Sequence, residues 1–250
     1  MEKLIKVREV RNPLISVIIP TLNEEKYIEN TLLSLKWQNF KLPFEIIVSD
    51  SNSKDRTVSI AKKYADKIVI TKEKGIAKGR NIGAKYARGK YLVFLDADTI
   101  LLPNALEELY KEIRKRENSL ISLPVLPYNF DATFVLYYLF YNIFSKTTLK
   151  LKNPQVAGMI MCCKRKDFIK VGGFEEKNII IEDYEFSKKI KNLGKVKILD
   201  TTIALTSPRR IRKWGKLRGA IKYLLLYLIY LLGNTKITNK LGEKIYVPVR

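Results

Sequence analysis

Tyr91-Leu92-Val93-Phe94-Leu95-Asp96-Ala97-Asp98 is the stretch that decides the interpretation of the whole chain. An unbroken apolar run of this length, ended by polar residues, is typical of a strand that is buried on both faces of a sheet. The strand delivers two carboxylates, one residue apart, to the rim of that sheet. Such carboxylates can hold a hard divalent cation whose remaining positions take phosphate oxygens. We therefore predict a Mn²⁺ or Mg²⁺ site at Asp96 and Asp98 that binds a phosphorylated ligand.

The composition narrows the chemistry further. The chain has 250 residues, with 47 Lys and Arg against 25 Asp and Glu, a net charge of +22 and no histidine. This charge requires an anionic partner, which leaves nucleic acid, phosphorylated ligands and anionic lipid as candidates. The absence of histidine excludes His-based acid–base catalysis and His-containing zinc sites. Carboxylates must therefore carry out any proton transfer or metal binding.

Two features predict a cytoplasmic location. The first residues, Met1 to Lys6, lack the apolar core of a signal peptide, and the adjacent Cys162 and Cys163 suit a reducing compartment. The most apolar segment, Gly219 to Gly233, contains Lys222. As a helix it would reach about 22 Å, which is less than the roughly 30 Å of a bilayer's hydrocarbon core. We expect that it does not span a membrane alone.

Strands and helices alternate along the first half of the chain. Strands are predicted at residues 15–19, 44–49, 67–71 and 91–95, and helices at 24–35, 55–64, 76–87 and 103–117. This alternation predicts an α/β fold with a mostly parallel sheet flanked by helices, in which ligands bind at the carboxyl ends of the strands. Asp50 and Asp96 both fall at that edge.

The alternation becomes less regular after a soft boundary near residue 120. An extended segment is predicted at 120–126, a strand at 156–163, and helices at 166–171 and 183–193. The aromatic-rich stretch from Phe134 to Phe144 is either core beneath the sheet or a membrane contact, and its spacing favours core.

Six motifs occur in an order that closely resembles family 2 glycosyltransferases of the GT-A fold. They are Val17–Glu25, Val48–Thr57, Arg80–Ala84, Leu95–Asp98, Gly172-Gly173-Phe174 and Glu182-Asp183. The resemblance implies a GT-A glycosyltransferase domain over residues 1–207, with a nucleotide-sugar-binding half at 14–120 and an acceptor half at 121–207. A basic segment, a C-terminal helix and a tail would follow at 208–250.

The resemblance also implies how a nucleoside-diphosphate sugar is bound. It assigns the nucleotide to the turn formed by Pro20, Thr21, Leu22, Asn23 and Glu24. Asn23 could alternatively serve only as a helix cap. In the family, the acid at Asp50 hydrogen-bonds the base. A carboxylate accepts from an imide or amide N–H, so uracil or guanine fits, and UDP- or GDP-sugars are favoured.

The metal and the diphosphate are assigned in the same way. The resemblance implies that Asp98 coordinates Mn²⁺ or Mg²⁺ directly and that Asp96 contacts the ribose, or the ion through water. We expect Ala97 to leave space for the sugar. Arg80 can bridge sugar and diphosphate, and the alternative for Arg80 is a solvated helix face.

For catalysis, the resemblance makes Asp183 the base that accepts the acceptor's proton, with inversion at the anomeric carbon. The alternative is that Glu182 and Asp183 simply stabilise the start of a helix, where acids are favoured by about 0.3–1 kcal/mol.

The basic segment after Ser207 resembles one that folds over the donor diphosphate in several family members, and we assign that role to Arg210 and Lys216. The same cluster precedes the apolar helix, so an anionic membrane surface is a competing partner. Tyr223, Tyr227 and Tyr230 form one stripe on that helix, which suits an interfacial helix. Alternatively, this helix packs in a groove of the protein itself or at a dimer interface.

The sequence thus predicts a metal-dependent, inverting glycosyltransferase, associated peripherally with the cytoplasmic face of the membrane and acting on a lipid-linked acceptor. The acceptor would be a polyprenyl or dolichyl phosphate, or a lipid-linked glycan. A soluble enzyme acting on a non-lipid glycan is the first alternative. A nucleic-acid-binding protein is disfavoured, because the aromatic residues lie in apolar runs and do not alternate with basic residues.

Overall fold

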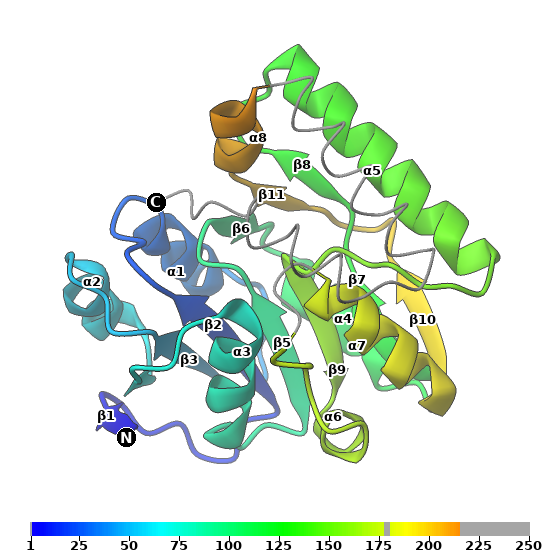
Figure 1. The fold of residues 1–250 in the computed structure, drawn as a ribbon. Coiled ribbons are helices and arrows are strands. Elements are labelled where there is room, and N and C mark those ends of the chain that lie inside the picture. Colours follow the sequence, from blue (N-terminus) through cyan, green and yellow to red (C-terminus); the bar gives the residue numbers. More distant parts are fainter. Residues whose placement is uncertain (1, 178–180, 216–250) are drawn as a thin grey trace.

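The computed structural model describes residues 2–177 and 181–215 (Figure 1). A large sheet has eight strands in the order β1-β4-β3-β2-β5-β9-β7-β10. Its strands are β1 Lys3–Lys6, β2 Ile15–Thr21, β3 Phe44–Asp50, β4 Lys67–Ile70, β5 Tyr91–Leu95, β7 Asn118–Ser122, β9 Ile160–Lys164 and β10 Lys195–Ile198. A small sheet contains β6 Thr99–Leu101, β11 Ala204–Thr206 and β8 Val125–Pro127. The helices are α1 Ile28–Lys36, α2 Thr57–Tyr64, α3 Ile76–Lys85, α4 Ala105–Ile113, α5 Ala132–Lys150, α6 Arg165–Lys170, α7 Glu182–Ile190 and α8 Arg209–Trp214, with a 3₁₀ turn at Lys191–Leu193.

The predicted α/β fold is confirmed. The four strands β4, β3, β2 and β5 pair in parallel, as the alternation of strands and helices requires. Several features were not predicted: β1 joins the edge antiparallel to β4, β9 runs antiparallel to both β5 and β7, β10 forms the other edge, and β6, β11 and β8 make a separate small sheet. A continuous apolar run shows that a strand is buried, but it does not encode the strand's direction.

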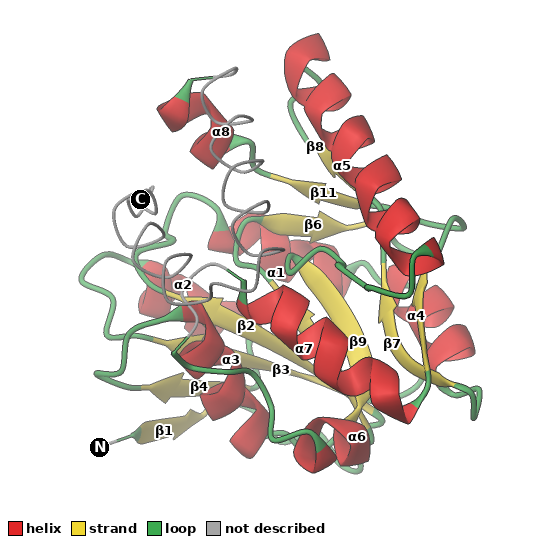
Figure 2. Cartoon of the chain, turned by 45° about the vertical axis from the view of Figure 1, so that its right-hand side comes forward, coloured by secondary structure: helices red, strands yellow, loops and turns green. Residues whose placement is uncertain are grey.

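Side-chain alternation along the strands divides the core into two layers. In β2, Val17 and Ile19 point into the layer shared with α1, α2 and α4, whereas Ile18 points into the opposite layer. Phe94 of β5 packs in that second layer against Phe174 and against residues of α6 and α7. Figure 2 shows α3, α6 and α7 on the same face of the sheet. Because helices cover both faces of the sheet, a ligand can approach its central strands only at their ends.

The first helix begins later than predicted. We expected it at Glu24, but α1 begins at Ile28. The reason is that the backbone N–H groups of Glu24 and Glu25 donate to side chains of the neighbouring loop, Thr57 Oγ1 at 2.7 Å and Asp55 Oδ2 at 3.1 Å. Residues 22–27 therefore form a turn across the ends of β2 and β3.

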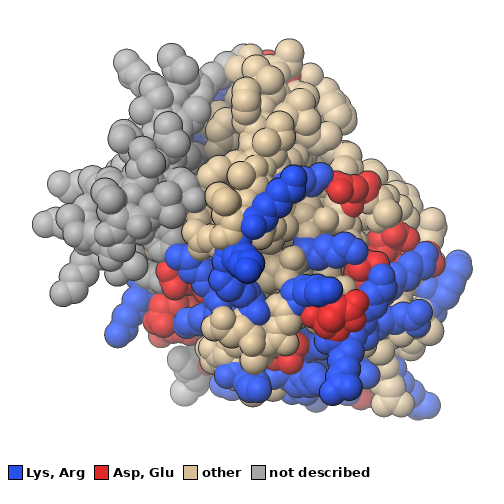
Figure 3. All heavy atoms as spheres, turned by 90° about the vertical axis from the view of Figure 1, so that its right-hand side faces the viewer, with Lys and Arg blue, Asp and Glu red and all other residues tan. Residues whose placement is uncertain are grey.

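The aromatic-rich stretch forms most of α5, which lies with α8 and the small sheet beside one end of the large sheet (Figure 1). The prediction of core holds for only one side of this helix, where Phe134 and Tyr138 are buried. On the other side, Leu136, Leu139, Phe140 and Ile143 are exposed. The upper part of the face in Figure 3 has few charged side chains, whereas Lys and Arg gather over its lower part.

The predicted C-terminal helix at 219–233 lies outside the described residues. In the part of the chain that is described, none of the helices combines the length and the hydropathy that crossing a bilayer would require.

Candidate functional site

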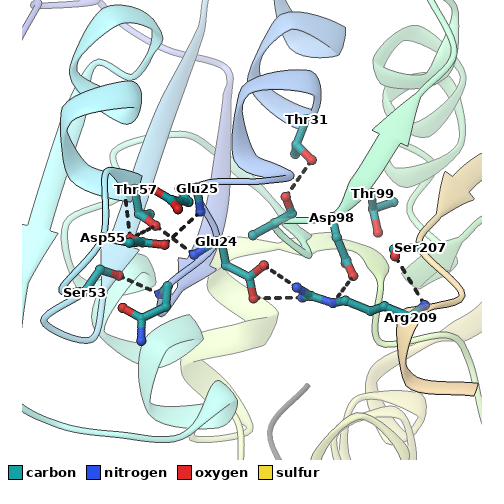
Figure 4. Close-up of polar contacts among 12 residues, drawn as sticks. Glu24, Glu25, Thr31, Ser53, Asp55, Thr57, Asp98, Thr99, Ser207 and Arg209 are labelled. Atoms are coloured by element: carbon teal, nitrogen blue, oxygen red, sulfur yellow. Dashed lines mark hydrogen bonds and ion pairs between the residues drawn. The ribbon is translucent and has the colours of Figure 1, made fainter. Parts of the chain in front are cut away.

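The carboxyl ends of three adjacent strands, β3, β2 and β5, bring residues 20–24, Asp50 and residues 96–98 to one edge of the sheet. Pro20 and Thr21 end β2, and Asn23 adopts a positive φ of 56° in the turn that follows. The Asn23 N–H donates to Ser53 Oγ at 2.8 Å, and its own Oδ1 accepts from the Lys54 N–H at 2.8 Å. These bonds fix the turn against the next loop, whose Ser53, Asp55 and Thr57 lie beside Glu24 and Glu25 in Figure 4. Asn23 therefore does not cap α1, so that alternative is wrong.

Asp50 ends β3 and is completely buried. Its Oδ1 accepts from the hydroxyls of Thr21 at 2.9 Å and Ser53 at 2.5 Å, and its Oδ2 accepts from the Ser53 N–H at 2.8 Å. The carboxylate thus ties the ends of β2 and β3 together. Leu22, the other residue predicted in this turn, is half-buried.

The two acids after β5 contact different cations. Asp96 Oδ1 accepts from Arg80 Nη2 at 3.0 Å, and Asp98 Oδ2 lies 2.9 Å from Arg209 Nε. We expected Ala97 to leave space for the sugar, but its side chain is 4% exposed and belongs to the core. Residues 96–99 form a turn, in which the Thr99 N–H donates to the Asp96 carbonyl at 3.1 Å, and this turn places the Ala97 methyl in the hydrophobic core.

Arg209, at the first turn of α8, completes this part of the site (Figure 4). Its Nη1 and Nη2 donate to the two carboxylate oxygens of Glu24 at 2.6 and 2.8 Å, while Nε faces Asp98. The guanidinium carbon also lies 4.5 Å from the centre of the Tyr27 ring. The sequence analysis missed Arg209 and named the adjacent Arg210, whose positive charge also acts on Asp98. A run of basic residues does not reveal which of them contacts the acids directly. Lys216 lies outside the described residues.

Burial raises the pKa of Asp98 to about 6, against the opposing effect of Arg209 and together with the repulsion from Asp96 and Glu24. The free protein therefore holds a carboxylate that is costly to ionise beside two other acids. A cation at this position relieves that cost.

Arg80, on α3, lies beneath the acids. Its side chain is 1% exposed, so the alternative of a solvated helix face is wrong. Nη1 donates to Glu182 Oε1 at 3.0 Å, and Nη2 donates to both Asp96 and the carbonyl of Gly158, the latter at 2.8 Å. Arg80 thus connects the acid after β5 to the acids that begin α7. We had expected Arg80 to bridge sugar and diphosphate. Its guanidinium is instead enclosed and does not reach outward.

Asp183 is the second residue of α7 and is half-buried. Its Oδ1 accepts from the Tyr184 N–H at 2.9 Å. Burial, followed by the neighbouring Glu182 carboxylate, raises the pKa of Asp183 well above its ordinary value, although Arg80 opposes this. A carboxylate with a raised pKa is a better proton acceptor than an ordinary one.

The described residues contain no group of three or more Asp, Glu, Cys or His side chains arranged to hold a metal ion. Asp96 and Asp98 instead form a small donor set at the edge of the sheet. Mg²⁺ and similar cations are commonly bound by one or two carboxylates, with substrate phosphates and water completing the shell. The residues present fit a cation of that kind, and the guanidinium of Arg209 already occupies a cationic position between Glu24 and Asp98.

Comparison with known families agrees with this geometry. The family described as glycosyl transferase family 2 matches residues 16–168. A second family, described as the N-terminal domain of galactosyltransferase, matches residues 139–207. Together the two matches cover every acid discussed above.

Relatives with similar sequences are glycosyltransferases. The Staphylococcus aureus poly(ribitol-phosphate) β-N-acetylglucosaminyltransferase TarS is 39% identical over 100 residues, which are 37% of this chain and 18% of TarS. An uncharacterized glycosyltransferase of Haemophilus influenzae is 29% identical over 184 residues, covering 71% of this chain and 62% of that protein. The chain thus spans less than two thirds of either relative.

Solved structures share the fold. TarS in complex with UDP superposes with a TM-score of 0.58 at 21% identity, covering 86% of this chain and 65% of that one. A mannosyltransferase from Pyrobaculum calidifontis in complex with GDP-Man and Mn²⁺ gives a TM-score of 0.65 at 22% identity, covering 88% of this chain and 67% of that one.

Proposed function

Because the chain belongs to glycosyl transferase family 2, we propose that it transfers a sugar from a nucleoside-diphosphate sugar to an acceptor. The observation that carries this proposal is the chain of contacts from Asp96 through Arg80 to Glu182. These contacts join the end of β5 to the start of α7, where Asp183 lies. A donor site and a proton acceptor are thereby held on one framework.

The donor is a UDP- or GDP-sugar. The solved relatives support this, since TarS structures contain UDP or UDP-GlcNAc and the mannosyltransferase contains GDP-Man. Asp50 and the turn of residues 20–24 receive the nucleoside. Asp50 must exchange one of its bonds to Thr21 or Ser53 for the imide or amide N–H of the base.

Asp98, with Asp96 beside it, holds Mn²⁺ or Mg²⁺ together with the donor diphosphate. The Mn²⁺ in the mannosyltransferase complex supports the choice of a divalent ion. Such an ion would neutralise the charge that develops on the leaving diphosphate. Arg80 orients Asp96 from below, and Arg210 adds positive charge close to Asp98.

Asp183 is the base. It accepts the proton of the acceptor hydroxyl while the acceptor oxygen attacks the anomeric carbon from the face opposite the diphosphate, and the configuration inverts. Its raised pKa supports this role.

The acceptor is lipid-linked, and the enzyme works at the cytoplasmic surface of the membrane. The exposed apolar stripe of Leu136, Leu139, Phe140 and Ile143 on α5 supports this, because its spacing is that of a helix lying in a bilayer interface. The basic residues of α8 begin beside α5, with Arg212 lying 5.7 Å from the Phe134 ring. They suit an anionic lipid surface. The predicted interfacial role of the helix at 219–233 belongs to the same proposal, whereas Lys216 keeps the role of binding the donor diphosphate together with Arg210.

The function is tested by thermal unfolding of the full chain with UDP-, GDP- and dTDP-sugars, each with and without Mn²⁺. A ligand that binds only the folded state raises the melting temperature. We expect a UDP- or GDP-sugar to do so, and only with the metal. If no nucleotide sugar raises the melting temperature, the proposal is wrong. Sedimentation with anionic vesicles tests the membrane separately: Phe140→Glu should weaken it, and unchanged binding would favour a non-lipid glycan acceptor.

A further inference from the structure

Arg209 occupies a cationic position at the site, and all its nitrogen atoms are engaged (Figure 4). Nη1 and Nη2 form a two-pronged pair with Glu24, and Nε faces Asp98 at 2.9 Å. The Tyr27 ring lies against the guanidinium. A planar guanidinium that pairs in this way is well suited to bridge two carboxylates.

The pair is sheltered from water. The side chain of Arg209 is 18% exposed, and those of Glu24 and Asp98 are each 12% exposed. In such surroundings ion pairs are screened less than they are at the surface. A divalent ion that takes Asp98 as a ligand therefore meets the weakly screened charge of the guanidinium and competes with it for the carboxylate.

We propose that Arg209 is a built-in cation that holds Glu24 and Asp98 together until the metal and the donor displace it. This inference rests on the proposed function, because it assumes that Asp98 is a metal ligand. Its consequence is that the free protein binds the metal weakly, since only the fraction of molecules with Arg209 turned away is competent. The nucleotide sugar then promotes metal binding by offering the released guanidinium a new anion.

The start of α8 keeps Arg209 close to the site after this exchange. The Ser207 N–H donates to the backbone carbonyl of Asp98 at 3.2 Å, and Ser207 Oγ accepts from the Arg209 N–H at 3.3 Å. Only the side chain has to turn for the guanidinium to leave the carboxylates. It can then pair with a diphosphate bound at the same edge.

The test measures Mn²⁺ binding alone, by electron paramagnetic resonance of the free ion, with the full chain and without nucleotide. We expect Arg209→Gln to bind Mn²⁺ at least about tenfold more tightly than the wild type, as follows if about a tenth or less of wild-type molecules are competent. Arg212→Gln is the matched control, because it removes the same charge from the same helix at a residue that lies against Phe134. It should bind Mn²⁺ as the wild type does.

Equal Mn²⁺ affinity in the wild type and Arg209→Gln would overturn the inference. An equal gain in Mn²⁺ affinity in Arg212→Gln would also overturn it, because such a gain would result from the lower net charge alone. Arg209→Lys provides a second variant if Arg209→Gln does not fold. Its gain in Mn²⁺ affinity should be smaller, because lysine keeps the positive charge but cannot form the two-pronged pair with Glu24. Sugar transfer by the wild type separates the two proposals: transfer with unchanged Mn²⁺ affinity in the variants removes only this inference, whereas failure to bind any nucleotide sugar removes the function.

Discussion

Gly158 lies where any side chain would collide with Asp183. A Cβ atom at residue 158 would come within 2.6 Å of Asp183 Oδ2 and 3.2 Å of Arg80 Nη2. The glycine carbonyl, in turn, accepts from Arg80 at 2.8 Å. The missing side chain therefore lets the proposed base and the buried arginine approach each other.

Gly158→Ala should consequently impair catalysis more than binding. The added methyl must push the Asp183 carboxylate out of place, and misplacement of a reacting group by about 1 Å can cost on the order of 100-fold in rate. We expect kcat to fall by about that factor, while calorimetry gives a nucleotide-sugar affinity close to that of the wild type. Wild-type kcat in this variant would show that the position of Asp183 is unimportant.

Asp183→Asn should distinguish two kinds of acceptor. A hydroxyl acceptor must lose a proton, whereas a phosphomonoester has a second pKa of about 6 and is already ionised at neutral pH. We expect transfer to a hydroxyl to be nearly abolished and transfer to a polyprenyl phosphate to be affected far less. Equally large losses on both acceptors would contradict the role of Asp183 as a base.

Donor binding should depend on pH through Asp98, whose pKa is raised to about 6. Below pH 6 the folded protein holds a proton that a metal ion must displace, so metal-dependent affinity should fall by about tenfold per pH unit. For the same reason this group's contribution to the free energy of unfolding decreases as the pH rises from about 4 to 6, since the folded state binds the extra proton. Calorimetry with an intact nucleotide sugar, which lacks a terminal phosphate, is the appropriate measurement. If the metal-dependent affinity for the nucleotide sugar does not change between pH 5 and 7, Asp98 is not the metal ligand.

Arg80 should be needed for stability as well as for the site. Its replacement by leucine leaves Glu182 buried without its cation, and breaking a buried pair in this way costs about 3–5 kcal/mol. We expect urea denaturation to report a loss of that size for Arg80→Leu. Arg56→Leu is the control, because that side chain is 81% exposed and its pair with Glu25 should contribute less than about 1 kcal/mol. A similar loss in both variants would argue against a special role for Arg80.

Much of this site could be predicted from the sequence because the motifs follow strands whose apolar runs are unmistakable. The positions of Asp50 and Asp96 at one edge needed only the parallel order of β3, β2 and β5. Contacts between residues that are far apart in the chain could not be predicted from the sequence. The fork of Arg209 onto Glu24 joins residues far apart in the chain, and nothing in the local sequence distinguishes Arg209 from Arg210. The burial of Arg80 likewise depends on Gly158 and α7, which fold over it from the second half of the chain.

The central claim is that Asp98 anchors a cation and, through it, the donor diphosphate. The most direct measurement is a calorimetric titration of the full chain with a UDP- or GDP-sugar in the presence of Mn²⁺, comparing the wild type with Asp98→Ala. Asp200→Ala serves as the control, because Asp200 is an exposed acid paired with Lys146 and its loss changes the net charge equally. We predict that Asp98→Ala abolishes the metal-dependent part of binding and that Asp200→Ala retains it. Undiminished metal-dependent affinity in a folded Asp98→Ala protein would contradict the account.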